Sequence, residues 1–234
     1  MTTIETLLGG FPGKSGRGYL GWSAVYLVIT ADGRKVLFDT GGYNERDSLI
    51  GVLKQRSTPP ESVHAVVLSH LHFDHAANWD LFPNAEIIVH EKEMEYALSP
   101  QADTCVLRYH ARALKENRRL RLITEDCKLA GELQLVLVPG HTPGCIALQI
   151  GDSVLCGDAL KNRWDLGGEV SPPVWNASGF RASVAKVASL GSKLYPGHDV
   201  PLQLVENGWR PIGTPAIRIS FPNGKQQDVA LLVD

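Results

Sequence analysis

Ser69-His70-Leu71-His72-Phe73-Asp74-His75 places three imidazoles and one carboxylate within six residues, at the end of an apolar run of strand length. In an extended segment residues two apart point the same way, so His70 and His72 can reach one metal ion together. Asp74 and His75 stand where a helix is expected to begin, and their side chains can serve a second ion. Crowding these groups is costly unless a cation holds them. An exposed polar turn is the alternative, but turns before helices favour Asp or Ser and have no use for three histidines.

Predicted strands and helices alternate on both sides of this motif, which indicates an α/β protein. Residues 63–69 form a continuous apolar run, typical of a strand buried on both faces. Asn223-Gly224 predicts a hairpin in the tail, with strands at 216–221 and 228–233. The other strands are expected at residues 23–30, 35–38, 86–90, 132–138, 145–150, 153–156 and 193–195, and the helices at 48–55, 91–98, 106–119 and 180–190.

Four further polar residues each follow a predicted strand: Asp39, His141, Asp158 and His198. Side chains in this position gather at one edge of a sheet, where α/β proteins usually build their sites. A single histidine is more often a core or surface residue than a ligand. Five of the eight histidines nevertheless fall into the two patterns described so far, so we expect one polar site at this edge.

The composition is that of an ordinary globular protein, with 44% apolar and 21% charged residues in a chain of 234. A net charge of -2 gives no electrostatic reason to expect a nucleic acid or a membrane surface as partner, so we expect a small-molecule substrate. No stretch approaches the ~20 apolar residues of a membrane span, and the N-terminus lacks a secretory pattern. The four cysteines show no CxxC spacing, which favours reduced thiols. We therefore expect a cytoplasmic protein with a single domain, residues 1–234.

The motifs, in this order, resemble those of the metallo-β-lactamase superfamily. The matching segments are Asp39-Thr40-Gly41, Ser69 to His75 as quoted above, Pro139-Gly140-His141-Thr142-Pro143-Gly144, Gly157-Asp158 and Pro196-Gly197-His198. The resemblance implies an αββα sandwich with its site at one edge. It also implies one metal ion on His70, His72 and His141, a second on Asp74, His75 and His198, and Asp158 bridging both. Asp39 would orient a ligand imidazole by a hydrogen bond without touching metal.

A ligand set of nitrogen and oxygen without thiolate suits two divalent ions, with zinc expected and iron or manganese also accommodated. Such a pair lowers the pKa of bound water and would supply a hydroxide for attack on a carbonyl ester. The two carboxylates, Asp74 and Asp158, are the expected catalytic residues among the ligands, and Asp158 would also help to steer the proton. No serine or cysteine motif offers a side-chain nucleophile.

Within the superfamily, Leu71-His72-Phe73-Asp74-His75-Ala76 and Ile87-Ile88-Val89 resemble the N-acyl-homoserine lactonases, which implies a lactone substrate. Those enzymes often carry a tyrosine shortly after the bridging aspartate, and here Lys161 stands at that place. It is either an electrophilic substitute or a solvated loop lysine, and the second interpretation is preferred.

Other activities remain open. A glyoxalase II-type thioesterase uses the same ligands, but only 36 residues (234 − 198) follow His198, which leaves little room for a helical glutathione-binding region. Asp39-Thr40-Gly41-Gly42 and Leu81-Phe82-Pro83 also resemble the animal metallo-β-lactamase-domain-containing proteins, which suggests a phosphodiesterase or nuclease. A redox or inactive member of the fold is the alternative from another class, although all seven expected ligands are present.

Aromatic residues near the motifs are candidates for the walls of an apolar substrate pocket. Trp164 and Trp175 follow Asp158, and the opposite wall is expected from Phe11, Tyr19 and Trp22. Core packing is an equal alternative for the two tryptophans that follow Asp158. Exposed apolar positions in the tail hairpin are compatible with a homodimer, which nothing in the pattern requires.

Overall fold

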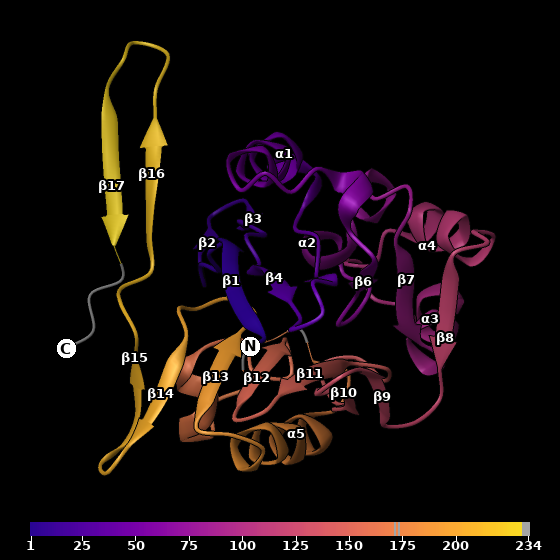
Figure 1. Ribbon diagram of the computed structural model, residues 1–234. Helices are drawn as coiled ribbons and strands as arrows, with labels where there is room; N and C mark the ends of the chain where they lie inside the picture. Colours follow the sequence, from indigo (N-terminus) through magenta and orange to yellow (C-terminus); the bar gives the residue numbers. More distant parts are fainter. Residues whose placement is uncertain (171, 173, 231–234) are drawn as a thin grey trace.

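Two β-sheets face each other in the computed structural model, which describes residues 1–170, 172 and 174–230 (Figure 1). The first sheet comes from the N-terminal half of the chain and the second from the C-terminal half. In sheet order, the first contains β1 (Thr3–Leu8), β4 (Val25–Ile29), β5 (Lys35–Phe38), β6 (Ala65–Val67), β7 (Glu86–His90) and β8 (Leu120–Ile123). The second contains β15 (Gly208–Pro211), β14 (Leu202–Val205), β13 (Lys193–Pro196), β12 (Ser153–Gly157), β11 (Ile146–Ile150), β10 (Leu133–Leu137) and β9 (Cys127–Ala130).

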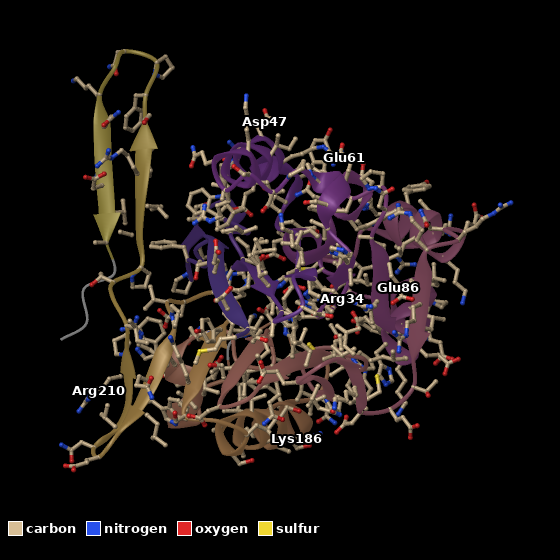
Figure 2. All side chains as sticks on the ribbon, in the orientation of Figure 1. Arg34, Asp47, Glu61, Glu86, Lys186 and Arg210 are labelled. Atoms are coloured by element: carbon tan, nitrogen blue, oxygen red, sulfur yellow. The ribbon has the colours of Figure 1, made fainter. Side chains whose placement is uncertain are left out.

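Helices cover the outer face of each sheet, so the layers run α, β, β, α (Figure 1). The first sheet carries α1 (Arg46–Gln55), α2 (Phe73–Ala76), α3 (Glu91–Leu98) and α4 (Arg108–Lys115), and the second carries α5 (Ala177–Ser189). Charged side chains such as Asp47, Glu61 and Lys186 lie on the outer surface of these layers (Figure 2). The αββα sandwich predicted from the sequence is confirmed.

The central strands β4 and β6 are apolar at every position because both of their faces are buried. In β4, Tyr26 and Val28 point between the two sheets, whereas Val25 and Leu27 point to the outer helices. Residues of the second sheet, Leu135 among them, complete the inner layer from the other side. This arrangement explains why the central strands show continuous apolar runs and not the alternation of a half-exposed sheet.

Several predicted elements differ in extent from the observed ones. The strand expected at 63–69 ends at Val67, after which the chain turns toward the site. The helix expected at 106–119 covers only Arg108–Lys115, because the Asn117 side chain accepts the Arg119 N–H in a turn and the following residues join β8. The short strands β2 (Lys14–Ser15) and β3 (Gly18–Tyr19) form a hairpin in the glycine-rich segment near the N-terminus.

The tail hairpin, β16 (Ala216–Ser220) and β17 (Gln226–Ala230), extends away from the sandwich, and within the described part of the chain its two strands pair only with each other (Figure 1). The sequence predicts the second strand of this hairpin at 228–233, whereas the observed strand begins at Gln226. Residues 231–234 lie outside the described part of the chain. Among the described residues, no helix has both the length and the apolar character that crossing a membrane requires.

Candidate metal centre

The strands that precede the site end at one edge of the sandwich. In the first sheet β5 and β6 are parallel, so Asp39 and the 70–75 segment emerge at the same edge. In the second sheet β12 and β13 are parallel, which brings Asp158 and His198 together. Since β10 runs in the same direction as β12, His141 follows at that edge too. The site therefore draws its residues from both sheets.

Three imidazoles form the first cluster. The Nε2 atom of His141 lies 3.2 Å from His70 Nε2 and 3.0 Å from His72 Nδ1. All three side chains are buried. His70 and His72 approach from the turn after β6 with a ring-to-ring distance of 4.5 Å, as the alternating geometry of an extended segment predicts.

A second cluster combines Asp74, His75 and His198. The Nε2 atoms of His75 and His198 are 3.3 Å apart, and His198 Nε2 lies 3.5 Å from Asp74 Oδ2. His75 belongs to the short helix α2, and its ring lies 4.2 Å from that of His70, so the two clusters adjoin. The seven residues expected from the sequence thus lie together as two neighbouring groups, joined by Asp158.

The Asp158 carboxylate lies between the two clusters. Its Oδ2 atom is 3.2 Å from His141 Nε2, and its Oδ1 atom is 3.3 Å from both His75 Nε2 and His198 Nε2. One oxygen therefore faces each cluster, which is the arrangement that a bridging ligand requires.

Hydrogen bonds from outside the clusters orient the imidazoles. Asp39 Oδ2 lies 2.8 Å from His75 Nδ1 and also accepts the Ser69 hydroxyl. His72 Nε2 contacts Asp103 Oδ2 at 3.0 Å, and His198 Nδ1 contacts the backbone carbonyl of Trp22 at 3.1 Å. The orienting role predicted for Asp39 matches this geometry. Asp103 was missed because nothing in its local sequence marks it.

Glycine is required at two positions beside the site. A Cβ atom at Gly197 would collide with the carboxylate of Asp158, and a Cβ at Gly144 would collide with the backbone of Glu93. Gly197 directly precedes His198, and Gly144 lies three residues after His141. The Pro-Gly-His and His-Thr-Pro-Gly patterns thus reflect close approach of the backbone.

Burial and neighbouring charges divide the ionisable groups. Burial and the adjacent imidazoles lower the pKa of His70 and His141, which favours the neutral form that binds metal. Burial opposes ionisation of Asp158, but His198, His75 and His141 outweigh it and hold the pKa of Asp158 well below its usual value. The result is a carboxylate surrounded by imidazole nitrogens.

These residues fit divalent cations. The Asp158 Oδ1 atom is buried without a hydrogen-bond partner, although two imidazole nitrogens face it. Nitrogen lone pairs that converge within about 3 Å repel one another unless a cation or proton lies between them. Nitrogen and carboxylate oxygen without thiolate are ligands that zinc, iron and manganese accept. Among the residues that the structure describes, three groups are able to hold an ion: His70, His72 and His141; His70, His75 and Asp158; and Asp74, His75 and His198.

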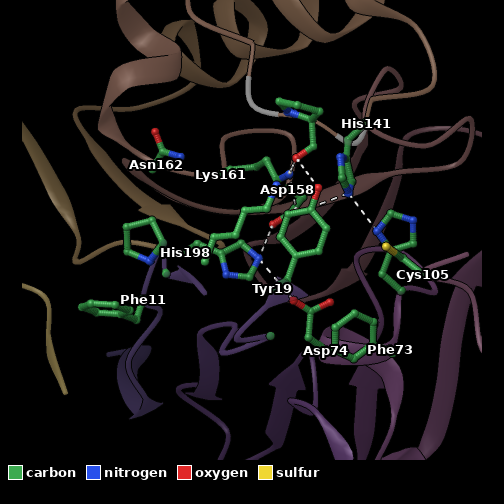
Figure 3. Close-up of a pocket in the computed structure, with 16 residues that line it drawn as sticks. Phe11, Tyr19, Phe73, Asp74, Cys105, His141, Asp158, Lys161, Asn162 and His198 are labelled. Atoms are coloured by element: carbon green, nitrogen blue, oxygen red, sulfur yellow. Dashed lines mark hydrogen bonds and ion pairs between the residues drawn. The ribbon is translucent and has the colours of Figure 1, made fainter. Parts of the chain in front are cut away.

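A cavity of about 200 Å³ opens over the clusters (Figure 3). Phe11 and Tyr19 line it, as expected, but Trp22, Trp164 and Trp175 do not. Trp164 and Trp175 point to solvent, with exposures of 38% and 54%, so the proposed tryptophan wall is wrong.

Lys161 also departs from its preferred interpretation as a solvated loop residue. The residue is buried, with a relative exposure of 7%, and it lines the cavity. Its Nζ atom lies 3.9 Å from Asp158 Oδ2. Lys161 therefore belongs to the site.

Comparison with known proteins agrees with this geometry. Residues 20–198 match the metallo-β-lactamase superfamily. The chain belongs to this superfamily. It is 29% identical over 165 residues to an N-acyl homoserine lactonase from a Bacillus species, which covers 67% of this chain and 64% of that protein. It is 31% identical over 183 residues to metallo-beta-lactamase domain-containing protein 1 of Xenopus laevis, covering 74% of this chain and 70% of that protein. The chain thus spans less than two thirds of the length of the lactonase.

Solved structures of the superfamily share the fold. A quorum-quenching N-acyl homoserine lactone hydrolase superposes with a TM-score of 0.64 at 25% identity, covering 76% of this chain and 80% of that one. A probable metal-dependent hydrolase from Staphylococcus aureus gives a TM-score of 0.70 at 17% identity, with coverages of 88% and 94%, and that similarity concerns the fold alone. The superfamily and the fold predicted from the sequence are confirmed.

Proposed function

We propose that this protein is a hydrolase that holds two divalent metal ions and opens the ester bond of a lactone. One ion would be held by His70, His72 and His141, the second by Asp74, His75 and His198, with Asp158 shared. Asp74 and Asp158 are the proposed catalytic carboxylates. When bound, such ions activate water for attack and polarise a carbonyl group.

The position of Asp158 between two clusters of three ligands carries this proposal. One carboxylate oxygen faces each cluster, at 3.2 Å from His141 and at 3.3 Å from His75 and His198. A site for a single ion would not need the second group. Zinc is the proposed metal, since imidazole and carboxylate are its usual ligands outside thiolate sites.

The lactone substrate is supported by the relatives, several of which are N-acyl homoserine lactonases. The cavity supports a small acyl substrate. Phe11, Tyr19 and Phe73 offer apolar surface beside the clusters, and the polar groups converge at one end. Such a combination of apolar walls and a few placed polar groups is typical of small-molecule sites.

The test is the initial hydrolysis rate of zinc-, manganese- and iron-loaded protein on a panel of lactones, thioesters and phosphodiesters. We expect a preference for lactones that a chelator abolishes and added metal restores. A preference for thioesters or phosphodiesters would contradict the lactone substrate while leaving the metal site intact.

Two substitutions test the metal assignment. His72→Ala removes a ligand of the first ion and Asp158→Ala removes the shared one, so the first should lower the bound metal and the second should lower it further, each with a loss of turnover. The exposed Lys54→Met serves as the control. Full turnover by an Asp158→Ala protein without metal would refute the two-ion proposal.

A further inference from the structure

Two hydrogen-bond donors that line the cavity converge on one oxygen atom. The Lys161 Nζ atom donates to the Pro172 carbonyl oxygen at 3.2 Å, and the Tyr19 hydroxyl donates to the same oxygen at 3.4 Å (Figure 3). Tyr19 belongs to β3, near the N-terminus, whereas Lys161 follows β12. The fold therefore builds, from residues 142 positions apart (161 − 19), a place where an oxygen receives two hydrogen bonds.

This place adjoins the metal clusters. Lys161 Nζ lies 3.9 Å from Asp158 Oδ2, and that carboxylate oxygen lies 3.2 Å from His141 Nε2. The Lys161 side chain is only 9% exposed, so water screens its charge weakly. Lys161 thus lies beside the clusters, and Tyr19 lines the same cavity.

We propose that Tyr19 and Lys161 together bind the leaving oxygen of the ester while its bond to the acyl carbon breaks. This inference rests on the proposed ester hydrolysis and adds two catalytic residues to it. The Pro172 carbonyl marks the position, and a substrate oxygen takes its place there.

The reaction balances without a further reactant. Water adds to the acyl carbon, the bond from that carbon to the leaving oxygen breaks, and the proton that water releases ends on the leaving oxygen. Negative charge grows on this oxygen before the proton arrives. Tyr19 and Lys161 stabilise that charge as hydrogen-bond donors, and donors placed in advance for a developing charge lower the barrier.

The pair also determines the class of substrate. An alkoxide is a poor leaving group, so lactones and alkyl esters depend strongly on donors at the leaving oxygen. A phenolate or a thiolate leaves readily and gains little from them. The geometry therefore favours lactones and alkyl esters over aryl esters and thioesters that carry the same acyl group.

The experiment measures kcat and KM of the metal-loaded enzyme for one acyl group on alkyl, aryl and thiol leaving groups. The variants are Tyr19→Phe, Lys161→Met and the double variant, with Lys161→Arg as a conservative change. Tyr109→Phe, at a residue that is 85% exposed, and the exposed Lys54→Met are matched controls. Bound metal and Tm are measured for every variant, so that a folding defect is separated from a catalytic one.

We expect each single variant to lose about 10²-fold in kcat on the alkyl ester, the size found for loss of one such donor. Losses on the aryl ester and thioester should be several-fold at most, with metal content unchanged. Because both donors serve one oxygen, the double variant should lose less than the product of the two single losses. Lys161→Arg keeps a donor and should recover part of the rate.

Equal losses on all three leaving groups would overturn the inference, because they would place the effect on acyl binding or on the metal. A loss in the double variant equal to the product of the two single losses would contradict the claim that both donors bind the same oxygen atom. If the proposed lactone hydrolysis is wrong, the result is different: the wild-type enzyme does not hydrolyse lactones. The role of Tyr19 and Lys161 is then tested on open-chain esters. An enzyme that cleaves no oxygen ester would refute both the proposed function and this inference.

Discussion

At the scale of single residues, the site depends on groups that hold the ligands in place. Asp39 adopts a backbone φ of 62°, unusual for a residue other than glycine, and this conformation aims its carboxylate at the site. One oxygen accepts the Ser69 N–H at 2.7 Å, and the other lies 2.8 Å from His75 Nδ1. Asp39 thereby ties the start of the histidine motif to one of its last members.

Asp39→Asn tests this role. The amide can keep the hydrogen bond from Ser69, but it replaces a carboxylate that makes His75 a better ligand. We expect metal affinity to fall about 10–100-fold. Competition with a coloured chelator measures it, with the exposed Asp47→Asn as control. An unchanged metal affinity would show that the Asp39 carboxylate does not strengthen metal binding by His75.

At the scale of elements, helix α3 joins the two loops that carry the first cluster. The buried Glu93 accepts the Leu71 N–H at 2.9 Å with one oxygen and the Gly144 N–H at 3.1 Å with the other. Leu71 lies between His70 and His72, and Gly144 lies three residues after His141. One carboxylate thus sets the distance between ligands from the two sheets.

Glu93→Gln should disturb this spacing. Its amide group can accept only one of the two hydrogen bonds, which leaves a buried N–H facing another donor. Such a loss costs about 1–3 kcal/mol of unfolding free energy, and metal affinity should fall with it. Urea unfolding and metal titration measure both. Glu95→Gln, exposed on the same helix, is the control, and equal behaviour of the two variants would contradict the assignment.

At the scale of the whole molecule, the clusters join the two sheets. Strands of the first sheet lead into four of the ligands: His70, His72, Asp74 and His75. Strands of the second sheet lead into the other three: His141, Asp158 and His198. Metal ions that bind here hold the halves of the sandwich together. Binding to the folded state alone adds about 2.7 kcal/mol for each ion at a hundredfold excess over Kd.

Removal of metal should therefore lower the thermal stability. A protein of this size loses about 2–4 °C in Tm for each kcal/mol, so chelation should lower Tm by roughly 5–10 °C for each ion. Differential scanning calorimetry with and without chelator measures the shift. The Asp158→Ala protein should respond much less, and an equal shift in that variant would place the effect outside the site.

The tail hairpin makes a second prediction at this scale. An isolated two-stranded hairpin is marginally stable in water, and among the described strands β16 and β17 pair only with each other. Deleting residues 214–234 should therefore leave Tm and metal content nearly unchanged. The homodimer expected from the apolar positions of this hairpin stays a prediction. Sedimentation velocity of the full and shortened chains tests it, and a monomer in both would contradict it.

The sequence by itself determined the features that rest on local spacing. His70 and His72 share a direction because residues two apart do so in any extended segment. The continuous apolar runs of β4 to β7 required burial on both faces, which only a covered sheet provides. The outer strands β1, β8, β9 and β15 were missed because each has a charged residue that interrupts such a run, and all four lie at sheet edges.

Only the tertiary structure decided the contacts between distant segments. The burial of Lys161 depends on Pro172 and on the neighbouring site, and no spacing in the sequence encodes it. Asp103 reaches His72 and Glu93 reaches Gly144 across different elements. Trp164 and Trp175 lie close to Asp158 in sequence, yet they point away from the cavity. Direction after a loop is set by long-range packing, which a local pattern cannot specify.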